Sequence, residues 1–187
     1  MPRSLQKKIV VGRIIMKRLF RAGFVWLACT LSSIQVVAAQ PAIQGCSAEN
    51  SFANTQTLHC GAGITIIAEE GARFTLQVER KGRVEAIELD GKALLIEVPA
   101  RPGGNRFQVI TPQAIAAVRG TKWAVDVAGE KTSVFVVNGR VGVGRRSGSR
   151  GVTLGPGEGV DVEPGVPLTV KRWAAARVSA LMARLGQ

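Results

Sequence analysis

Few residue types in this chain could carry out catalysis. A single histidine, His59, stands directly beside Cys60, and the sequence contains neither a Gly-x-Ser-x-Gly nor a His-Glu-x-x-His motif. Glu69 and Glu70 are adjacent, so in a strand their side chains would face apart. Residues 155–159 are rich in glycine, but no helix is expected after them whose N-terminus could bind a phosphate. We therefore predict no catalytic residue, no cofactor and no metal site, and expect a protein that is not an enzyme.

The strong positive charge comes largely from the N-terminal segment. The net charge is +12, and seven of the 25 Lys and Arg residues, with no acidic residue, precede residue 40. The rest of the chain has 25 − 7 = 18 basic and 13 acidic residues, about +5, which is ordinary for a soluble domain. It also lacks the interleaved aromatic residues of a single-strand-binding surface. We therefore expect no nucleic-acid partner.

The same N-terminal segment has the features of an export signal. Basic residues at 17–21 precede an uncharged stretch that ends in Ala38 and Ala39. This pattern predicts a signal peptide over residues 1–39, cleaved between Ala39 and Gln40, with Met16 as an alternative start. The alternative is an uncleaved membrane anchor, although the run is short for a span and contains polar residues. A lipoprotein site at Cys46 is a third and weaker hypothesis. The predicted location is the periplasm, with membrane contact only through the signal segment if it is not cleaved.

Two cysteines remain after such cleavage, because Cys29 lies within the signal segment. An even pair in an exported chain predicts a disulfide between Cys46 and Cys60, with 13 residues between them. Closing this loop should contribute about 3 kcal/mol, mostly by restricting the unfolded chain. The alternative is a metal site formed by Cys46, His59 and Cys60, which lacks a fourth ligand at a suitable spacing.

Short apolar segments separated by turn-forming residues predict strands from residue 63 onward. The first four expected strands are Ile64–Ile67, Phe74–Val78, Val84–Leu89 and Leu94–Val98, separated by turns at Glu70-Gly71, Lys81-Gly82 and Asp90-Gly91. Later strands are expected at Val152–Leu154, Gly159–Val162 and Leu168–Val170. Residues 40–62 are polar and are predicted to be a loop or extended lead-in that the cysteines tether.

The stretch from residue 107 to residue 143 determines the predicted fold class. A sharp corner is expected at Val118–Thr121, after which Trp123, Val125 and Val127 share one face of a half-buried strand. Residues 132–137 form a nearly continuous β-branched and aromatic run, typical of a strand covered on both faces. Asn138-Gly139 is a strong signal for a hairpin with a type I′ turn.

One helix is predicted, over Trp173–Leu185 at the end of the chain. Its apolar stripe consists of Ala174, Val178, Leu181, Met182 and Leu185. We expect this helix to cover an open end or edge of the β domain; the alternative is a basic amphipathic helix that lies on an anionic membrane.

The predicted fold is therefore all-β, a short β-helix or β-sandwich of many short strands, with one C-terminal α-helix and an N-terminal hydrophobic signal helix. Its parts are residues 1–39 as the signal peptide, 40–62 as the lead-in, 63–170 as the β domain and 171–187 as the amphipathic helix.

An ordered set of short motifs resembles the FecR domain family. The set comprises Thr111-Pro112, Val118-Arg119-Gly120-Thr121, the strand Val134–Val137 with its Asn138-Gly139 turn, and the Gly155-Pro156-Gly157-Glu158 corner. The resemblance implies an all-β periplasmic domain, which in founding members relays a ferric-siderophore signal from an outer-membrane receptor to a sigma factor. Those members carry a cytoplasmic anti-sigma segment before a membrane span. Only residues 1–21 precede the hydrophobic run here, so we expect the extracytoplasmic β domain to be the shared part.

Among the motif residues, Arg119 has the side chain best suited to bind a charged or polar group. We expect it to pair with a carboxylate such as Asp126 or Glu158, or to bond to loop carbonyls, and so to fix two turns. The alternative is a role in binding an anion such as citrate.

Two classes of function follow from these observations. The first is a non-enzymatic envelope module for binding or signalling, whose partner is an envelope protein or a cell-wall polymer such as glycan. The second is a hydrolase whose carboxylates are brought together by the fold.

Overall fold

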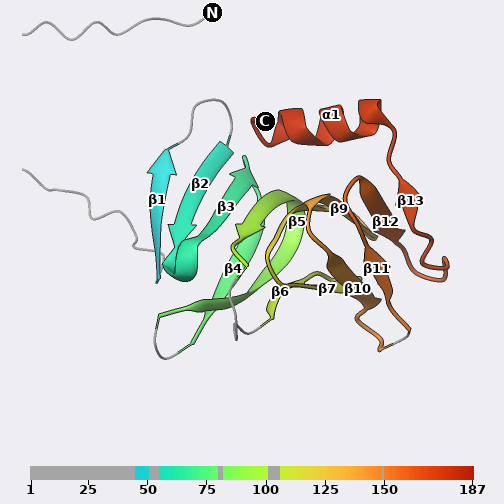
Figure 1. The fold of residues 1–187 in the computed structure, drawn as a ribbon, viewed down its shortest axis with the longest axis horizontal. Helices are drawn as coiled ribbons and strands as arrows, with labels where there is room; N and C mark the ends of the chain where they lie inside the picture. The colour runs from blue at the N-terminus through green and yellow to red at the C-terminus, as the bar shows by residue number, and fades with distance from the viewer. Residues whose placement is uncertain (1–44, 51–54, 80–81, 101–105, 149) are drawn as a thin grey trace, which may run out of the picture. The chain divides into compact units, whose positions relative to one another are not determined.

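The computed structural model describes residues 45–50, 55–79, 82–100, 106–148 and 150–187; the predicted signal peptide, with its cleavage position between Ala39 and Gln40, lies outside these ranges. The described chain consists of strands, one 3-10 turn and one C-terminal helix (Figure 1). The elements are β1 (Cys46–Asn50), β2 (Thr55–Cys60), η1 (Gly61–Gly63), β3 (Ile64–Glu69), β4 (Arg73–Val78), β5 (Val84–Val98), β6 (Phe107–Ile110), β7 (Ala114–Val118), β8 (Thr121–Ala128), β9 (Lys131–Asn138), β10 (Val141–Arg145), β11 (Val152–Leu154), β12 (Glu158–Val162), β13 (Lys171–Arg172) and α1 (Ala175–Arg184). The prediction of a mostly β protein with a C-terminal helix is confirmed. Within these ranges, no helix has the length and apolarity that crossing a bilayer requires.

The strands form one sheet that curls back on itself. We call β1, β2, β3, β8, β9, β12, β13 and the second part of β5 the helix-side half, because α1 lies over it; β4, β6, β7, β10, β11 and the first part of β5 form the opposite half (Figure 1). Among the described strands, β5 and β6 pair in parallel and the other pairs are antiparallel. The two halves enclose one core, as in a sandwich, and the antiparallel pairing differs from the parallel coils of a β-helix.

Strand β5 belongs to both halves because it bends in the middle. The sequence predicted a turn at Asp90-Gly91, but the strand continues through these residues with a register shift against β4. Lys92 has a positive φ of 69°. Leu89 and Leu94 are an odd number of residues apart, yet both point into the same core. In a regular strand they would face opposite sides, so glycine here marks an irregularity within a strand and not its end.

The predicted inward face of β8 is confirmed. Trp123 and Val125 are fully buried between the two halves, and Val127 is nearly so. Ala124, on the other face of the same strand, is also fully buried, because it packs beneath α1. Strand β9 was predicted to be covered on both faces over residues 132–137. Its side chains are buried from Thr132 to Val136, whereas Val137 is exposed.

Two other expectations about turns and ends differ from the structure. Asn138-Gly139 is a turn, but not a hairpin: β9 pairs with β8 and β12, whereas β10 pairs with β7 and β11 in the opposite half. The expected strand at Leu168–Val170 is absent from the described residues, and the short strand β13 follows it. Local sequence favours a turn at Asn-Gly, but it does not determine which strands pair on either side.

The predicted disulfide is confirmed, with Cys46 and Cys60 joined at an S–S distance of 2.03 Å. The two residues face one another in the β1–β2 pair. Of the two forms predicted for the lead-in, loop or extended, its described residues adopt the extended one: they form an antiparallel pair that extends the helix-side half through β3.

Helix α1 covers the outer face of the helix-side half, and not an end or edge of the domain. Leu181 and Leu185 pack against Ala93, Leu95 and Phe135, with Val178 and Met182 partly buried beside them. Ala174, expected in the apolar stripe, precedes the helix and is exposed. The helix has ten residues and no side-chain cap at its N-terminus, so it would be marginal alone. Packing on the sheet therefore stabilises it.

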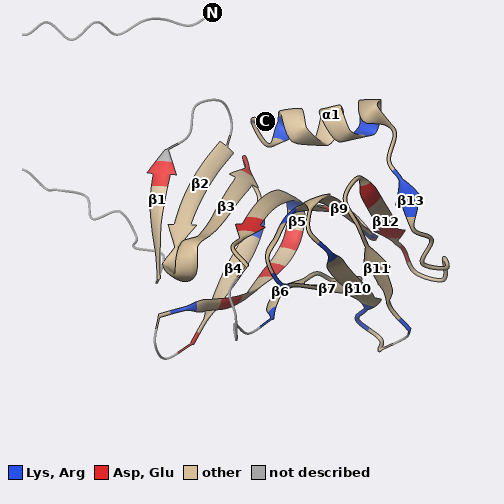
Figure 2. Ribbon diagram, viewed as in Figure 1, with Lys and Arg blue, Asp and Glu red and all other residues tan. Residues whose placement is uncertain are grey.

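Arginines near each end of α1 bind acidic residues of the sheet (Figure 2). Arg184 donates to Glu69 at 2.6 Å and to Asp126 at 2.9 Å, and Arg177 donates to both oxygens of Asp161. Arg177 also lies over the Trp173 ring, which stacks on Phe135. These contacts fix the position of the helix along the sheet.

Two of these three acidic partners, Glu69 and Asp161, have pKa values shifted toward the ionised form. Burial opposes ionisation of Glu69, but hydrogen bonds from Arg184 and the Ala93 N–H, together with the charges of Arg184 and Lys92, lower its pKa below the ordinary 4.5. Burial likewise opposes ionisation of Asp161, and hydrogen bonds from Arg177 and Ser133 outweigh it and lower the pKa below 3.8. Both carboxylates are therefore stabilised by the folded state.

Truncation of the buried helix residue should destabilise the domain. We expect Leu181→Ala to lower the free energy of unfolding by about 2–4 kcal/mol, because it leaves a cavity between helix and sheet. Denaturant titration measures this change. The matched control is Ser179→Ala on the exposed face of the same helix, which should change stability by less than about 0.5 kcal/mol. Equal effects of the two substitutions would contradict the observed packing.

Acid should weaken the attachment of the helix. Because the pKa values of Glu69 and Asp161 are lowered by folding, their contribution is complete above the ordinary values of 4.5 and 3.8. It is lost as the pH falls through the lowered values. Denaturant titrations from about pH 7 to about pH 3 should therefore show a loss of stability that is smaller in the double variant Glu69→Gln, Asp161→Asn. Parallel pH profiles of the two proteins would contradict this assignment.

Candidate functional site

Two motif corners carry the chain between the halves of the sheet and touch one another. The first, Val118–Thr121, leads from β7 to β8, and the second, at Asn138-Gly139, leads from β9 back to β10. Gly120 and Gly139 both have positive φ, at 67° and 89°. A Cβ on Gly139 would lie 2.6 Å from the Gly120 oxygen, and the Thr121 hydroxyl donates to the Arg140 carbonyl at 3.1 Å. The two crossings therefore require glycine for conformation and for close approach.

A third crossing runs from β11 to β12 through residues 155–158. The Gly157 N–H donates to the Val136 carbonyl at 2.9 Å, just before the second corner. The Glu158 carboxylate accepts a hydrogen bond from the Gly155 N–H at 2.8 Å, and this bond closes the turn. Gly157 has a φ of 77°. The hydrogen bond to Val136 therefore links this third corner to β9, which leads directly into the second corner, and the second corner contacts the first.

Thr111 and Pro112 lie in the turn between β6 and β7. The buried Thr111 hydroxyl accepts from the Ala114 N–H at 2.9 Å and lies 2.8 Å from the hydroxyl of Thr132 in β9. Thr132 in turn donates to the Gln113 side chain at 2.7 Å. Pro112 is exposed. The threonine pair thus links a turn of the opposite half to a strand of the helix-side half.

A methyl group at the first corner should be costly. In Gly120→Ala the new Cβ would lie 2.6 Å from the Ala100 Cβ and 2.8 Å from its Cα, at a φ of 67°. Gly129→Ala is the matched control, since Gly129 has a φ of 60° but no atom within 4 Å of the new Cβ. We expect the control to lose about 1 kcal/mol from backbone strain, and Gly120→Ala to lose clearly more, as measured by thermal and denaturant unfolding. Equal losses would show that the close approach has no energetic effect.

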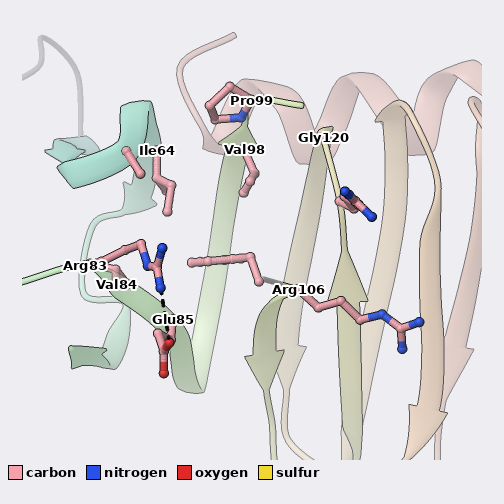
Figure 3. Close-up of a pocket in the computed structure, with 11 residues that line it drawn as sticks. Ile64, Arg83, Val84, Glu85, Val98, Pro99, Arg106 and Gly120 are labelled. Carbon is pink, nitrogen blue, oxygen red and sulfur yellow. Dashed lines mark ion pairs between the residues drawn. The ribbon is translucent and has the colours of Figure 1, made fainter. Parts of the chain in front are cut away.

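A small cavity opens beside the first corner, with an apolar floor. Ile64, Val84 and Val98 form much of this floor (Figure 3), together with Phe107. The cavity has a volume of about 90 Å³. Val84 and Val98 lie at the two ends of β5, which the bend of the strand brings to the same cavity. Ile64 and Phe107 begin β3 and β6.

Charged side chains surround this floor. Arg83, Arg106 and Arg119 line the cavity together with one acid, Glu85. Arg83 pairs with Glu79 at 3.0 Å and lies 3.8 Å from Glu85, the pair drawn in Figure 3. No ion pair or hydrogen bond joins Arg106 to another residue of the described chain, and its side chain is exposed. The rim carries three positive charges against one negative charge.

Of the carboxylates considered as partners of Arg119, Asp126 binds Arg184, and Glu158 accepts a hydrogen bond from a backbone N–H of its own turn. Arg119 lies at the rim of the cavity, next to Gly120. The sequence indicated Arg119 through its motif but did not indicate Arg83 or Arg106. These two are distant from Arg119 in sequence and meet it only because their strands converge, and no local pattern signals that convergence.

The described lining residues combine apolar and charged side chains. Among the described residues that line the cavity there is no histidine, cysteine, serine or threonine, and the one carboxylate among them, Glu85, lies beside an arginine. Nor does any cluster of His, Cys, Asp and Glu able to hold a metal ion occur among the residues that the structure describes. Apolar surface and guanidinium groups can bind an apolar group that carries negative charge.

Comparison with known proteins identifies the family of this fold. Residues 53–142 match the family model described as FecR protein. The chain contains a FecR domain. The match includes the motif residues from Thr111 to Gly139 and ends before Gly157 and Glu158, so the third crossing lies outside the matched part of the FecR domain. It also includes Arg83, Arg106 and Arg119, together with the floor of the cavity.

Solved structures show the same fold. A crystal structure of a candidate anti-sigma factor from Parabacteroides distasonis ATCC 8503 shares 22% identity and a TM-score of 0.58, covering 73% of this chain and 64% of that chain. A second crystal structure with the same description shares 20% identity and a TM-score of 0.54, covering 68% and 60%. This chain therefore spans less than two thirds of the length of either protein. No curated protein matches the chain.

Proposed function

We propose that this protein is an exported, non-enzymatic module of the bacterial envelope, whose FecR domain takes part in signalling by binding a partner protein in the periplasm. The observation that carries the proposal is the cavity beside the first corner, where an apolar floor is surrounded by three arginines on a FecR domain. The family match supports a regulatory role and not an enzymatic one. The anti-sigma description of the solved structures is consistent with such a role.

The disulfide supports a location outside the cytoplasm. Cys46 and Cys60 are joined within the β1–β2 pair, and disulfides persist mainly in oxidising compartments such as the periplasm. Together with the basic and apolar residues before Gln40, this favours export. The predicted cleavage after Ala39 forms part of the same proposal.

Glu69 and Asp161 are poorly suited to the general-acid role that the hydrolase alternative requires. A general acid in a glycan hydrolase needs a raised pKa, so that it holds a proton near neutral pH. Burial opposes ionisation of Glu69 and Asp161, but their hydrogen bonds to Arg184 and Arg177 lower both pKa values. Both carboxylates are bound to arginines of the helix and attach it to the sheet.

The proposal is tested in the native cells with an antibody against the full chain. After formaldehyde cross-linking, immunoprecipitation and mass spectrometry, we expect one envelope protein to be enriched with the exported chain. The matched control is a variant lacking residues 2–39, which stays in the cytoplasm and should not enrich that protein. N-terminal sequencing of the exported form should begin at Gln40.

Three results would contradict the proposal. One is recovery of the chain only with sedimented murein, which would assign it to the cell wall. Another is the same cross-linked protein in the control without the leader. The third is hydrolysis of an envelope polymer by the purified protein that is lost on substitution of one acidic residue.

A further inference from the structure

Strand β4 forms an edge of the opposite half that lacks the usual protection against further pairing. It pairs with β5, and no other strand of the described chain pairs with its second edge. Natural edge strands avoid association by being short, charged or interrupted by proline. The edge strands β11 and β13 have three and two residues, and β1 is polar apart from Cys46 and Ala48. By contrast, β4 has six residues, no proline and one charged residue, Arg73, at its first position.

The inward side chains of β4 leave part of the core open to water. They alternate with exposed residues along the whole strand. Phe74, Leu76 and Val78 pack against the core but are only partly buried. Ile87 and Leu89, which lie opposite two of them in β5, are completely buried. The difference arises because β5 has a neighbouring strand on each side, whereas β4 has one.

The free edge of β4 is regular enough to accept another strand. Each of the two register shifts in the β4–β5 pair leaves out one residue of β5, Asp90 at one end and Glu85 at the other. The bulges therefore lie in β5, and β4 keeps an unbroken alternation. A strand added at such an edge forms main-chain hydrogen bonds, and its alternate side chains must match the two faces of the sheet.

The sequence of β4 is complementary to itself in the antiparallel direction. When a two-fold axis perpendicular to the sheet passes through Leu76, residues that face the same side of the sheet lie opposite one another. Phe74 is then opposite Val78 of the second copy, Thr75 is opposite Gln77, and Leu76 is opposite its own counterpart. Apolar residues thus meet apolar residues, and polar residues meet polar ones.

The charges at the two ends of the strand favour the same direction. Arg73 lies opposite Glu79 of the second copy in this antiparallel pair, whereas an in-register parallel pair places each charge opposite its own counterpart. Both residues keep partners in their own chain, because Arg73 donates to the Asp90 carbonyl at 3.2 Å and Glu79 pairs with Arg83 at 3.0 Å. These charges therefore bias only the direction of pairing, and main-chain and apolar contacts supply the affinity.

We propose that the free edge of β4 is the interface of a homodimer, in which the β4 strands of two copies pair antiparallel about Leu76. The opposite halves of the two copies then form one continuous sheet. This inference goes beyond the proposed function, because it names a second copy of this chain as a partner. Dimerisation presents two FecR domains together, which strengthens binding to any partner that can contact both.

The first test measures the mass of the full chain, purified from the envelope fraction, by sedimentation velocity. We expect a dimer fraction that rises with concentration between about 1 and about 300 µM, because one pair of strands makes a small interface. A chain that stays monomeric over this whole range excludes the proposal.

Charges at two exposed positions test whether β4 forms the interface. The variant with Thr75→Lys and Gln77→Lys places like charges opposite one another twice, and should weaken dimerisation by roughly five- to tenfold. The matched control combines Thr75→Lys with Gln77→Glu, which places opposite charges there and should dimerise at least as well as the unsubstituted chain. Both variants lose the hydrogen bond from Gln77 to Glu88, so this loss does not distinguish them.

Cysteine substitution tests the register. Copies with Thr75→Cys and copies with Gln77→Cys carry different tags and are mixed under mild oxidation. Disulfides between the two variants should form several times faster than disulfides within either variant, because Thr75 lies opposite Gln77 and not opposite itself. Comparison of melting temperatures establishes that each variant is folded.

Two further outcomes would overturn the proposal. Equal dimerisation of the two charge variants would place the interface elsewhere on the molecule. Faster disulfide formation between two Thr75→Cys copies would contradict pairing about Leu76. Neither result affects the proposed function, because a monomer can still capture an envelope protein in the cross-linking experiment. Conversely, a dimer that captures no envelope protein would leave this interface standing and remove the proposed function.

Discussion

The close approach of two backbone segments at Gly120 and Gly139 is the constraint on which the rest of this structure depends. The chain passes from the opposite half to the helix-side half at the first of these glycines, and returns at the second. A side chain on Gly139 would meet the Gly120 oxygen and the Thr121 hydroxyl. Because both crossings occur in the same place, β8 and β9 pair with each other in one half, while β7 and β10 pair in the other. These two crossings of the chain therefore enclose the core between the halves.

The same corner connects the family motif to the candidate site. Arg119 is placed at the rim of the cavity by the conformation of Gly120, and the floor is supplied by β3, β5 and β6. The bend in β5 brings both of its ends to that floor, and the disulfide holds the turn before β3. Most of the motif therefore builds a scaffold, and one of its residues, Arg119, lies at the rim of the cavity.

The helix gives the helix-side half a second buried face. Without α1, the outer residues Ala93, Leu95, Ala124 and Phe135 would contact water. Apolar packing supplies the attraction, and the ion pairs of Arg177 and Arg184 determine where along the sheet the helix lies. The hydrogen bonds from these arginines also lower the pKa values of the partly buried carboxylates Glu69 and Asp161.

The sequence by itself determined the features that depend on neighbouring residues. Alternation placed Trp123, Val125 and Val127 on the inner face, and the apolar stripe placed a helix at the end. The even pair of cysteines that remains after the predicted signal segment indicated the disulfide. The ordered motifs also indicated the FecR family, and the match over residues 53–142 confirms it. Only the tertiary structure decided which strands pair across Asn138-Gly139, that β5 continues through Asp90 and Gly91, and that Arg83 and Arg106 meet Arg119 at one cavity. The physical reason is range: a turn or a strand follows from interactions between neighbouring residues, whereas strand pairing and the shape of a cavity follow from the packing of segments that are distant in sequence.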